Sequence, residues 1–202
     1  MLQSSDTNFL HLMFLYISII WETETYPSEW TLALLQPVYK GGGQDRLSPA
    51  SYRSIYLLTT ITKLLEGIIQ ARLTPFTEIH NTLTHVQKGS RPTRQIHDAI
   101  YALIAIIQHR AEKCLTSYCC FIDYTTVYLS VHRERLIMIL KDNYISGKMW
   151  NLLRENSKRV RIRVLHSLIP ASSQEPIGRV LPEGSRLSPT LFGIFAAELM
   201  TD

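Results

Sequence analysis

The sequence predicts an α+β fold, and three patterns indicate it. Apolar residues recur at the spacing of one helix face in residues 60–73 and 95–113. Residues 31–39 and 118–123 are rich in the β-branched and aromatic side chains that are typical of strands. Residues 158–164 alternate basic and apolar, as a strand with one solvated face does. With 202 residues, 46% of them hydrophobic, the chain can bury one sizeable core.

Charge and cysteine content narrow the function classes. A net charge of +4 suits a nucleic-acid partner, although many unrelated proteins share it. Three cysteines without a CxxC pair predict neither a disulfide framework nor a zinc site, and favour a reducing, intracellular location, either nucleus or cytoplasm. The apolar run 9–20 is too short to span a membrane, so we expect no membrane partner and a buried N-terminal helix within residues 1–25.

A long helix should follow the first predicted strand. The strand 31–39 ends at Lys40 and three glycines, and the helix 60–73 comes after a polar loop. Its apolar residues, such as Ile61, Leu65 and Ile69, share one face. Glu66 is assigned with the other charged residues of this helix to positions outside that face.

Asp123 stands at the junction of a predicted buried strand and a predicted helix near 132–141. A carboxylate there needs a partner, because an ionised acid in an apolar setting costs several kcal/mol, about 3–5 when a buried charge is left uncompensated. One interpretation pairs Asp123 with a neighbouring arginine or makes it a helix cap. The other makes it a metal ligand.

Several blocks in order resemble one family, the reverse transcriptases. Residues 118–131, with Asp123, Tyr128, Ser130 and Val131, resemble the family's first catalytic block. Residues 181–192 resemble its second palm block, which is usually proline, glutamine, glycine, serine, any residue, leucine, serine, proline. Residues 27–41, 52–66 and 87–91 resemble the fingers blocks of the enzymes from non-LTR (LINE-like) retrotransposons.

This resemblance implies a right-hand polymerase architecture. The expected division is an N-terminal helix in residues 1–25, a fingers part in 26–95 and a partial palm in 96–202. Helices would back an antiparallel palm sheet, and the Asp123 strand would present an unpaired edge of that sheet.

The resemblance also implies site residues. Asp123 would be the catalytic carboxylate and a ligand of Mg²⁺ or Mn²⁺, expected only in a complete enzyme. The residues implied for nucleotide binding are Lys40, Arg53, Tyr128, Glu183 and Gly184. Those implied for template and primer binding are Gln87, Gly89, Arg91, Arg161 and Arg163. Tyr128 could instead be plain core, and the arginines of 158–164 an ordinary solvated sheet face.

Departures from the family pattern bear on activity. Tyr56 replaces the family's serine and Glu183 its glutamine, while Ser54, Lys88, Ser90, Val127 and Leu129 are further departures. The family's aspartate pair follows the second palm block by a few dozen residues, and no Asp-Asp pair occurs in this sequence. We therefore expect a truncated RNA-directed DNA polymerase domain, uncertain as an enzyme and inactive as this chain. Its partners would be an RNA template, a DNA primer and deoxynucleoside triphosphates, with no disulfide partner. The alternative is a vestigial, non-catalytic nucleic-acid-binding piece.

Overall fold

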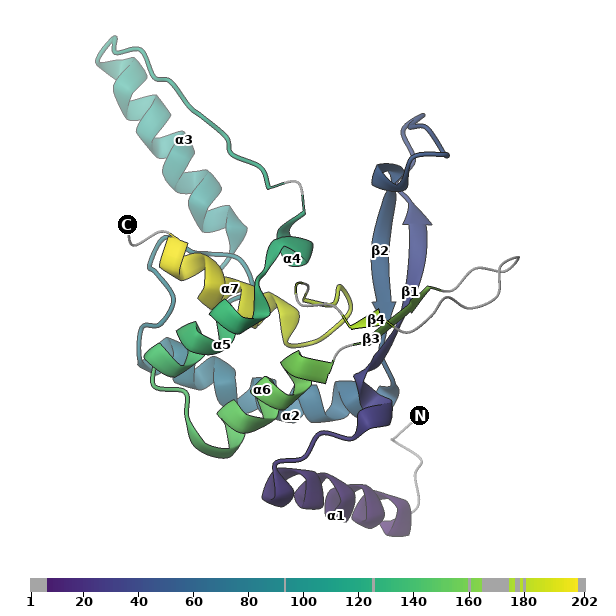
Figure 1. Cartoon of the computed structure of the whole chain (residues 1–202). Coiled ribbons are helices and arrows are strands. Elements are labelled where there is room, and N and C mark those ends of the chain that lie inside the picture. Colours follow the sequence, from purple (N-terminus) through teal and green to yellow (C-terminus); the bar gives the residue numbers. More distant parts are fainter. Residues whose placement is uncertain are drawn as a thin grey trace.

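Helices form the body of the molecule, and a two-stranded arm, residues 32–57, extends from it (Figure 1). This computed structural model describes residues 7–92, 94–124, 126–159, 161–164, 175–176, 179 and 181–199. The elements are α1 (Thr7–Thr23), η2 (Ser28–Thr31), β1 (Leu32–Tyr39), η3 (Pro49–Ser51), β2 (Tyr52–Leu57), α2 (Thr60–Ile79), α3 (Ile96–Glu112), α4 (Val127–Ser130), α5 (Arg133–Asp142), α6 (Gly147–Arg159), β3 (Arg161–Val164), β4 (Glu175–Pro176) and α7 (Ser188–Leu199).

The sheet is mixed, which corrects the predicted antiparallel palm sheet. Its order is β2-β1-β3-β4, with β1 antiparallel to β2 and parallel to β3. In the register, Tyr56 lies opposite Leu35 and Arg53 opposite Val38, so Tyr56 and Arg53 point to opposite faces. The strand predicted at 31–39 is present as β1. Of the strand predicted at 158–164, only Arg161–Val164 is present, as β3, because helix α6 continues to Arg159. The Asp123 segment contributes no strand.

Helix α2 is the central helix of the helical body. Its N-cap Thr59 accepts a hydrogen bond from the Thr62 amide at 3.2 Å, which satisfies one of the free amides of the first turn. The helix runs past the predicted end at residue 73 and continues through Pro75 to Ile79. Apolar side chains of α2, α5, α6 and α7 form one buried cluster that includes Leu65, Leu140, Leu152 and Ile194. Burial of such side chains stabilises the fold by about 1.5–3 kcal/mol each.

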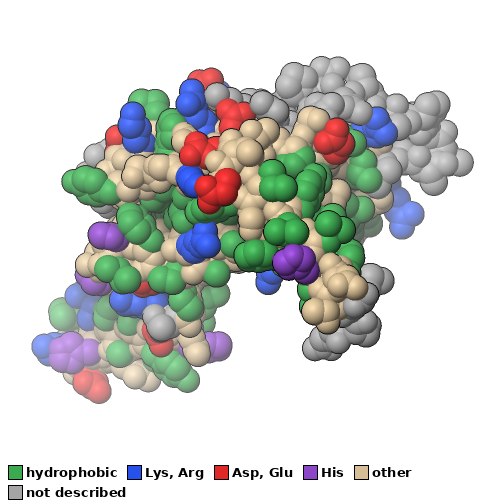
Figure 2. All heavy atoms as spheres, turned by 90° about the horizontal axis from the view of Figure 1, so that it is seen from below, with side chains coloured by type: hydrophobic (Ala, Val, Ile, Leu, Met, Phe, Trp, Pro, Cys, Tyr) green, Lys and Arg blue, Asp and Glu red, His purple; other side chains and the backbone are tan. Residues whose placement is uncertain are grey.

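The N-terminal helix is less buried than the sequence predicts. Of the residues in α1, only Ile20 is fully buried, and the exposed side chains include Phe9, Leu12 and Phe14. The helix attaches through its second half, where the Arg72 guanidinium of α2 lies 4.2 Å from the ring centroid of Trp21. Seen from below, hydrophobic side chains reach the surface over much of the molecule (Figure 2).

The predicted buried strand at 118–123 is wrong. Residues 115–124 are irregular, and Tyr118, Phe121 and Ile122 are 80% exposed or more. A strand needs a neighbour for its amide and carbonyl groups, and no described strand lies beside this segment. The prediction that the Asp123 segment forms an unpaired edge of the sheet is therefore also wrong.

Helix α3 extends away from the body, and residues 113–124 run back from its tip to α4 (Figure 1). It forms as predicted, with a capping box between Gln95 and Asp98, but buries none of its residues. Its predicted apolar face, including Ile100 and Ile104, is exposed. In the described part of the chain, no helix has the length and apolar character needed to cross a membrane.

Candidate active site

The second palm block lies directly against the arm. The Tyr56 amide of β2 donates a 2.7 Å hydrogen bond to the Glu183 carbonyl. Gly184 has a φ of +120°, and a Cβ on it would lie 2.4 Å from the Tyr56 carbonyl oxygen. Only glycine tolerates both the backbone conformation and this close approach. Two blocks more than a hundred residues apart in sequence thus meet through their backbones.

A second set of contacts holds this loop, residues 181–188, on α2. The Glu66 carboxylate accepts from the Ser185 hydroxyl at 2.9 Å through Oε1 and from the Arg186 amide at 2.9 Å through Oε2. Within the loop, the Ser185 Oγ also accepts from the Leu187 amide at 3.1 Å, and the Ser188 hydroxyl donates to the Pro182 carbonyl at 2.8 Å. The loop is therefore fixed at both β2 and α2.

Two tyrosines lie near Glu183, and a buried arginine lies near one of them. Burial raises the pKa of Tyr128, and the nearby Glu183 carboxylate raises it further. Burial and then Glu183 also raise the pKa of Tyr56, while Arg133 lowers it. Burial lowers the pKa of Arg133 to about 10. The Tyr128 ring contacts Phe192 edge-on at 5.7 Å between centroids, so it is held half-buried beside the loop.

Asp123 is exposed in the irregular segment before α4. Two-metal nucleotidyl transfer needs several carboxylates around the ions. Within residues 7–199, as far as they are described, no three His, Cys, Asp or Glu side chains gather to hold a metal ion. The described residues therefore do not make up a metal centre with Asp123.

The predicted phosphate-binding residues lie on the arm and the sheet. Lys40 is exposed at the end of β1, where its Nζ donates to the Ala50 carbonyl at 2.7 Å. Arg53 is exposed on the sheet face opposite Tyr56. Arg163 pairs in register with Leu34, which in turn pairs with Leu57, so Arg163 belongs to the same face as Arg53. Arg161, at the start of β3, pairs with Leu32.

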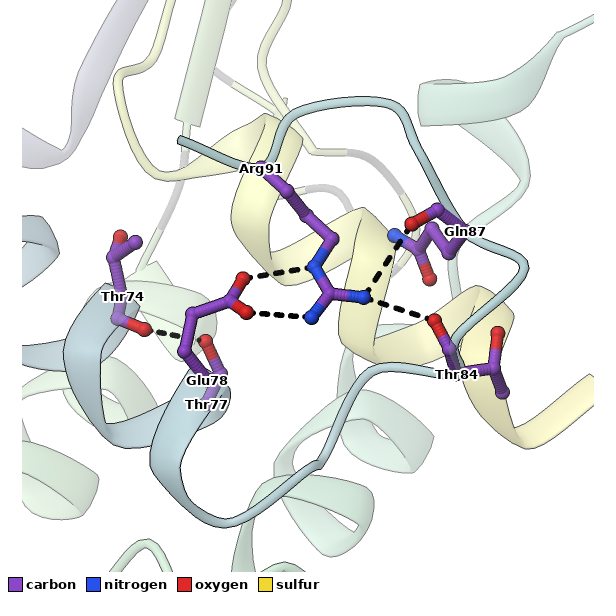
Figure 3. A network of polar contacts seen from close by, with 6 residues as sticks. All are labelled: Thr74, Thr77, Glu78, Thr84, Gln87 and Arg91. Carbon is purple, nitrogen blue, oxygen red and sulfur yellow. Dashed lines mark hydrogen bonds and ion pairs between the residues drawn. The ribbon is translucent and has the colours of Figure 1, made fainter. Parts of the chain in front are cut away.

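Arg91 is fixed inside the protein rather than offered to a template. Its Nε and Nη2 donate to the two Glu78 oxygens, and its Nη1 donates to the carbonyls of Thr84 and Gln87 (Figure 3). The Arg91 side chain is only 3% exposed, whereas that of Glu78 is 25% exposed. This geometry does not favour the predicted phosphate contact of Arg91; it favours a role in joining residues 84–91 to α2.

The neighbours of Arg91 in its block differ in setting. Gln87 is half-buried, and its Nε2 lies close enough to α7 that a Cβ on Gly193 would come within 2.5 Å of it. Gly89 is exposed, and a Cβ there would meet nothing within 4 Å. Of the three residues of this block predicted to bind template and primer, Gly89 is the exposed one.

The sequence analysis missed Glu66. This residue was assigned outside the apolar face of its helix, yet it is 2% exposed and lies with Thr62, Ile69 and Leu73 on the buried side of α2. The sequence spacing indicates the burial of Glu66, because residues 62, 66, 69 and 73 follow the spacing of one helix face. An acid at such a position requires buried donors.

Comparison with known proteins identifies the family. The family model described as "Reverse transcriptase (RNA-dependent DNA polymerase)" matches residues 39–202, which include both palm blocks and the contact between Tyr56 and Gly184. The chain belongs to the reverse transcriptase family. The match confirms the resemblance deduced from the ordered blocks.

Curated relatives place this reverse transcriptase domain among those of LINE-like elements. The "Probable RNA-directed DNA polymerase from transposon BS" of Drosophila melanogaster is 29% identical over 196 residues, covering 94% of this chain and 20% of the relative. The corresponding protein from transposon X-element of Drosophila melanogaster is 25% identical, covering 92% and 20%. The "RNA-directed DNA polymerase from mobile element jockey" of Drosophila funebris is 24% identical, covering 96% and 21%. The reverse transcriptase domain described here thus spans about a fifth of each relative.

Proposed function

We propose that this chain is the fingers and part of the palm of an RNA-directed DNA polymerase, with template-directed nucleotidyl transfer carried out by a larger polypeptide. Residues 26–95 would be the fingers part and residues 96–202 the partial palm, with residues 1–25 as an N-terminal helix. The contact of Gly184 with the Tyr56 backbone is the observation that carries this proposal. It joins a fingers block to a palm block, which is where a polymerase needs a rigid floor under the nucleotide.

The proposed nucleotide site lies beside that contact. Tyr128 would check the sugar of an incoming deoxynucleotide, because its ring is held by Phe192 and its hydroxyl lies in the field of Glu183. Glu183 and Gly184 would border the nucleotide, and Lys40 would reach its phosphates from the end of the arm. Arg53, proposed with them for nucleotide binding, lies on the sheet face opposite Tyr56 and would instead contact the nucleic-acid backbone. A carboxylate at 183 opposes phosphate binding by like-charge repulsion. Weak nucleotide affinity is therefore part of the proposal.

Asp123 is the proposed catalytic carboxylate. Reverse transcriptases in general use divalent metal ions, and a bound Mg²⁺ or Mn²⁺ would stabilise the charge that develops during phosphoryl transfer. The described residues around Asp123 do not complete such a centre. Because Asp123 is exposed, it is accessible for sharing a metal ion with carboxylates supplied by a larger polypeptide.

Nucleic-acid binding gives the first test. We expect weak, sequence-indifferent binding of an RNA–DNA duplex by Lys40, Arg53, Arg161 and Arg163, together with contacts from Gln87 and Gly89. Affinity should fall steeply as salt rises, because each phosphate contact releases counterions. Fluorescence anisotropy at several salt concentrations measures the slope of log affinity against log salt.

A charge-matched pair of variants makes this test specific. Arg53→Gln should weaken binding and reduce the salt slope by about one. Arg154→Gln removes the same charge from α6, where the guanidinium lies 5.1 Å from the Trp150 ring centroid, and should leave the slope unchanged. Equal effects of the two substitutions, or an affinity that does not respond to salt, would contradict a phosphate-binding arm.

A second candidate is a nucleic-acid-binding protein without catalysis. The Glu183 carboxylate beside Tyr56 and Tyr128 favours it, because that charge disfavours nucleoside triphosphate binding while leaving the basic arm intact. Triphosphate binding by Glu183→Gln distinguishes the two candidates. A gain of affinity in this variant, together with primer extension in a longer polypeptide, supports the polymerase.

A further inference from the structure

One buried acid is not accounted for by the proposed chemistry. Glu66 is 2% exposed in the middle of α2, and its carboxylate faces the loop of residues 181–188. A buried carboxylate without donors would destabilise the fold, so its position requires the partners that surround it. Those partners are the side chain of Ser185 and the backbone of Arg186, both in the second palm block.

A second feature of α2 shows that the loop docks closely on the helix. A Cβ on Gly67, the residue after Glu66, would lie 2.8 Å from Nη1 of Arg186. Glycine inside a helix costs roughly 1 kcal/mol relative to alanine, and here it gives room to the arginine side chain. The loop therefore rests on α2 through the backbone and the side chain of Arg186.

We propose that Glu66 is a positioning residue that sets the place of the second palm loop, and with it Glu183 and Gly184, relative to strand β2. The Glu66 carboxylate fixes the loop at Ser185 and Arg186, and the Tyr56 amide fixes it at Glu183. A loop fixed on both sides of Gly184 has little freedom to move toward or away from the arm. This inference deepens the proposed function and rests on it where it assigns the loop to the nucleotide site.

The proposal predicts that the loop responds to protonation of Glu66. Burial raises the pKa of Glu66, while the Arg186 amide, the Ser185 hydroxyl and the cations of Lys63 and Arg186 oppose that rise. The other titratable groups facing this region are Tyr26 before η2 and Arg133 on α5. As pH falls through the raised pKa of Glu66, its carboxylate gains a proton and its bonds to the loop weaken.

Amide NMR and hydrogen exchange on the full chain test this directly. In the wild type, the amide signals of Ser185 and Arg186 should titrate above the ordinary glutamate range. Glu66→Gln should abolish that titration and speed exchange of the Arg186 amide about tenfold, since one uncharged acceptor oxygen replaces the two charged oxygens that bond to the loop. Glu183 is a second carboxylate in this loop, so the comparison is repeated with Glu183→Gln present in both proteins.

A matched control lies on the same helix. Glu78→Gln removes the charge that pairs with Arg91 and should loosen residues 84–91 without changing the Arg186 amide. If Glu66→Gln does not fold, Ser185→Ala removes one of the two bonds and should give a smaller acceleration at Arg186. Unchanged exchange at Arg186 in both variants, or a loop titration that persists in Glu66→Gln, would overturn the proposal. Failure of the protein to bind an RNA–DNA duplex would instead count against the proposed function and leave this result standing.

Discussion

At the scale of single residues, the hydrogen bonds of two glutamates on α2, Glu66 and Glu78, explain why neither side chain can be replaced without loss. Glu66 and Glu78 lie twelve residues apart on one helix, roughly 18 Å at 1.5 Å per residue. The first holds the loop of residues 181–188, and the second holds Arg91. The family pattern includes a glutamate at 66 and an arginine at 91, but it does not show that their partners are within the protein.

Gly184→Ala should destabilise the protein strongly. The added methyl would lie 2.4 Å from the Tyr56 carbonyl oxygen at a backbone φ of +120°. We expect a loss of about 2–4 kcal/mol in the free energy of unfolding, from the sum of strain and displaced backbone. Urea denaturation measures it. Gly89→Ala is the control, because a Cβ there meets nothing within 4 Å, and it should change stability by less than about 0.5 kcal/mol.

Arg91→Lys should also destabilise the protein, although it keeps the charge. Lysine cannot donate to both Glu78 oxygens and to the two carbonyls that Arg91 reaches, so we expect a loss of about 1–3 kcal/mol. The pairing with Arg91 holds the pKa of Glu78 below its ordinary value. The stabilisation from this ion pair is therefore fully present above the pKa of Glu78 in the unfolded chain, and it is lost as pH falls through the lowered pKa of Glu78 in the folded protein. Equal urea midpoints for Arg91→Lys and wild type near pH 7 would contradict this role.

At the scale of elements, helices were predicted well and the Asp123 segment was not. The periodicity of residues 60–73 and 95–113 predicted α2 and α3, because helix formation depends on local hydrogen bonds. The strand at 118–123 was predicted from its side chains, but a strand also needs a partner that sequence cannot supply. In the same way, the parallel pairing of β1 with β3 joins segments more than a hundred residues apart and left no local signal.

Helix α3 should be the least stable of the long helices. It buries no residue, and an isolated helix of 17 residues is marginal in water. Amides in the middle of α3 should exchange by local opening, whereas those of α2 around Leu65 and Ile69 should exchange only on global unfolding. Hydrogen-exchange mass spectrometry compares the two helices in one experiment. Protection of α3 equal to that of α2 would mean that its apolar face is covered in solution.

At the scale of the whole molecule, the reverse transcriptase domain has one junction, the loop of residues 181–188, that is hydrogen-bonded to both β2 and α2. The loop of residues 181–188 joins β2 to α2, and Tyr128 lies beside it. Asp123, Lys40 and Arg53 are exposed. Sequence blocks predicted the family, which the comparison confirms, and they proposed members of a site, since both depend on residue type and order. They could not predict which members meet, because that depends on packing between distant segments.

RNA-templated primer extension tests the central claim that this chain is a reverse transcriptase domain with Asp123 as its catalytic carboxylate. Three proteins are compared: the chain alone, the chain joined to the downstream polymerase region of the transposon BS relative and carrying Glu183→Gln, and this joined Glu183→Gln protein with Asp123→Ala added. We predict no extension by the chain alone, extension by the joined protein, and a loss of at least about a thousandfold when Asp123→Ala is added. Extension by the chain alone, or extension by the joined protein that Asp123→Ala leaves unchanged, would contradict this claim.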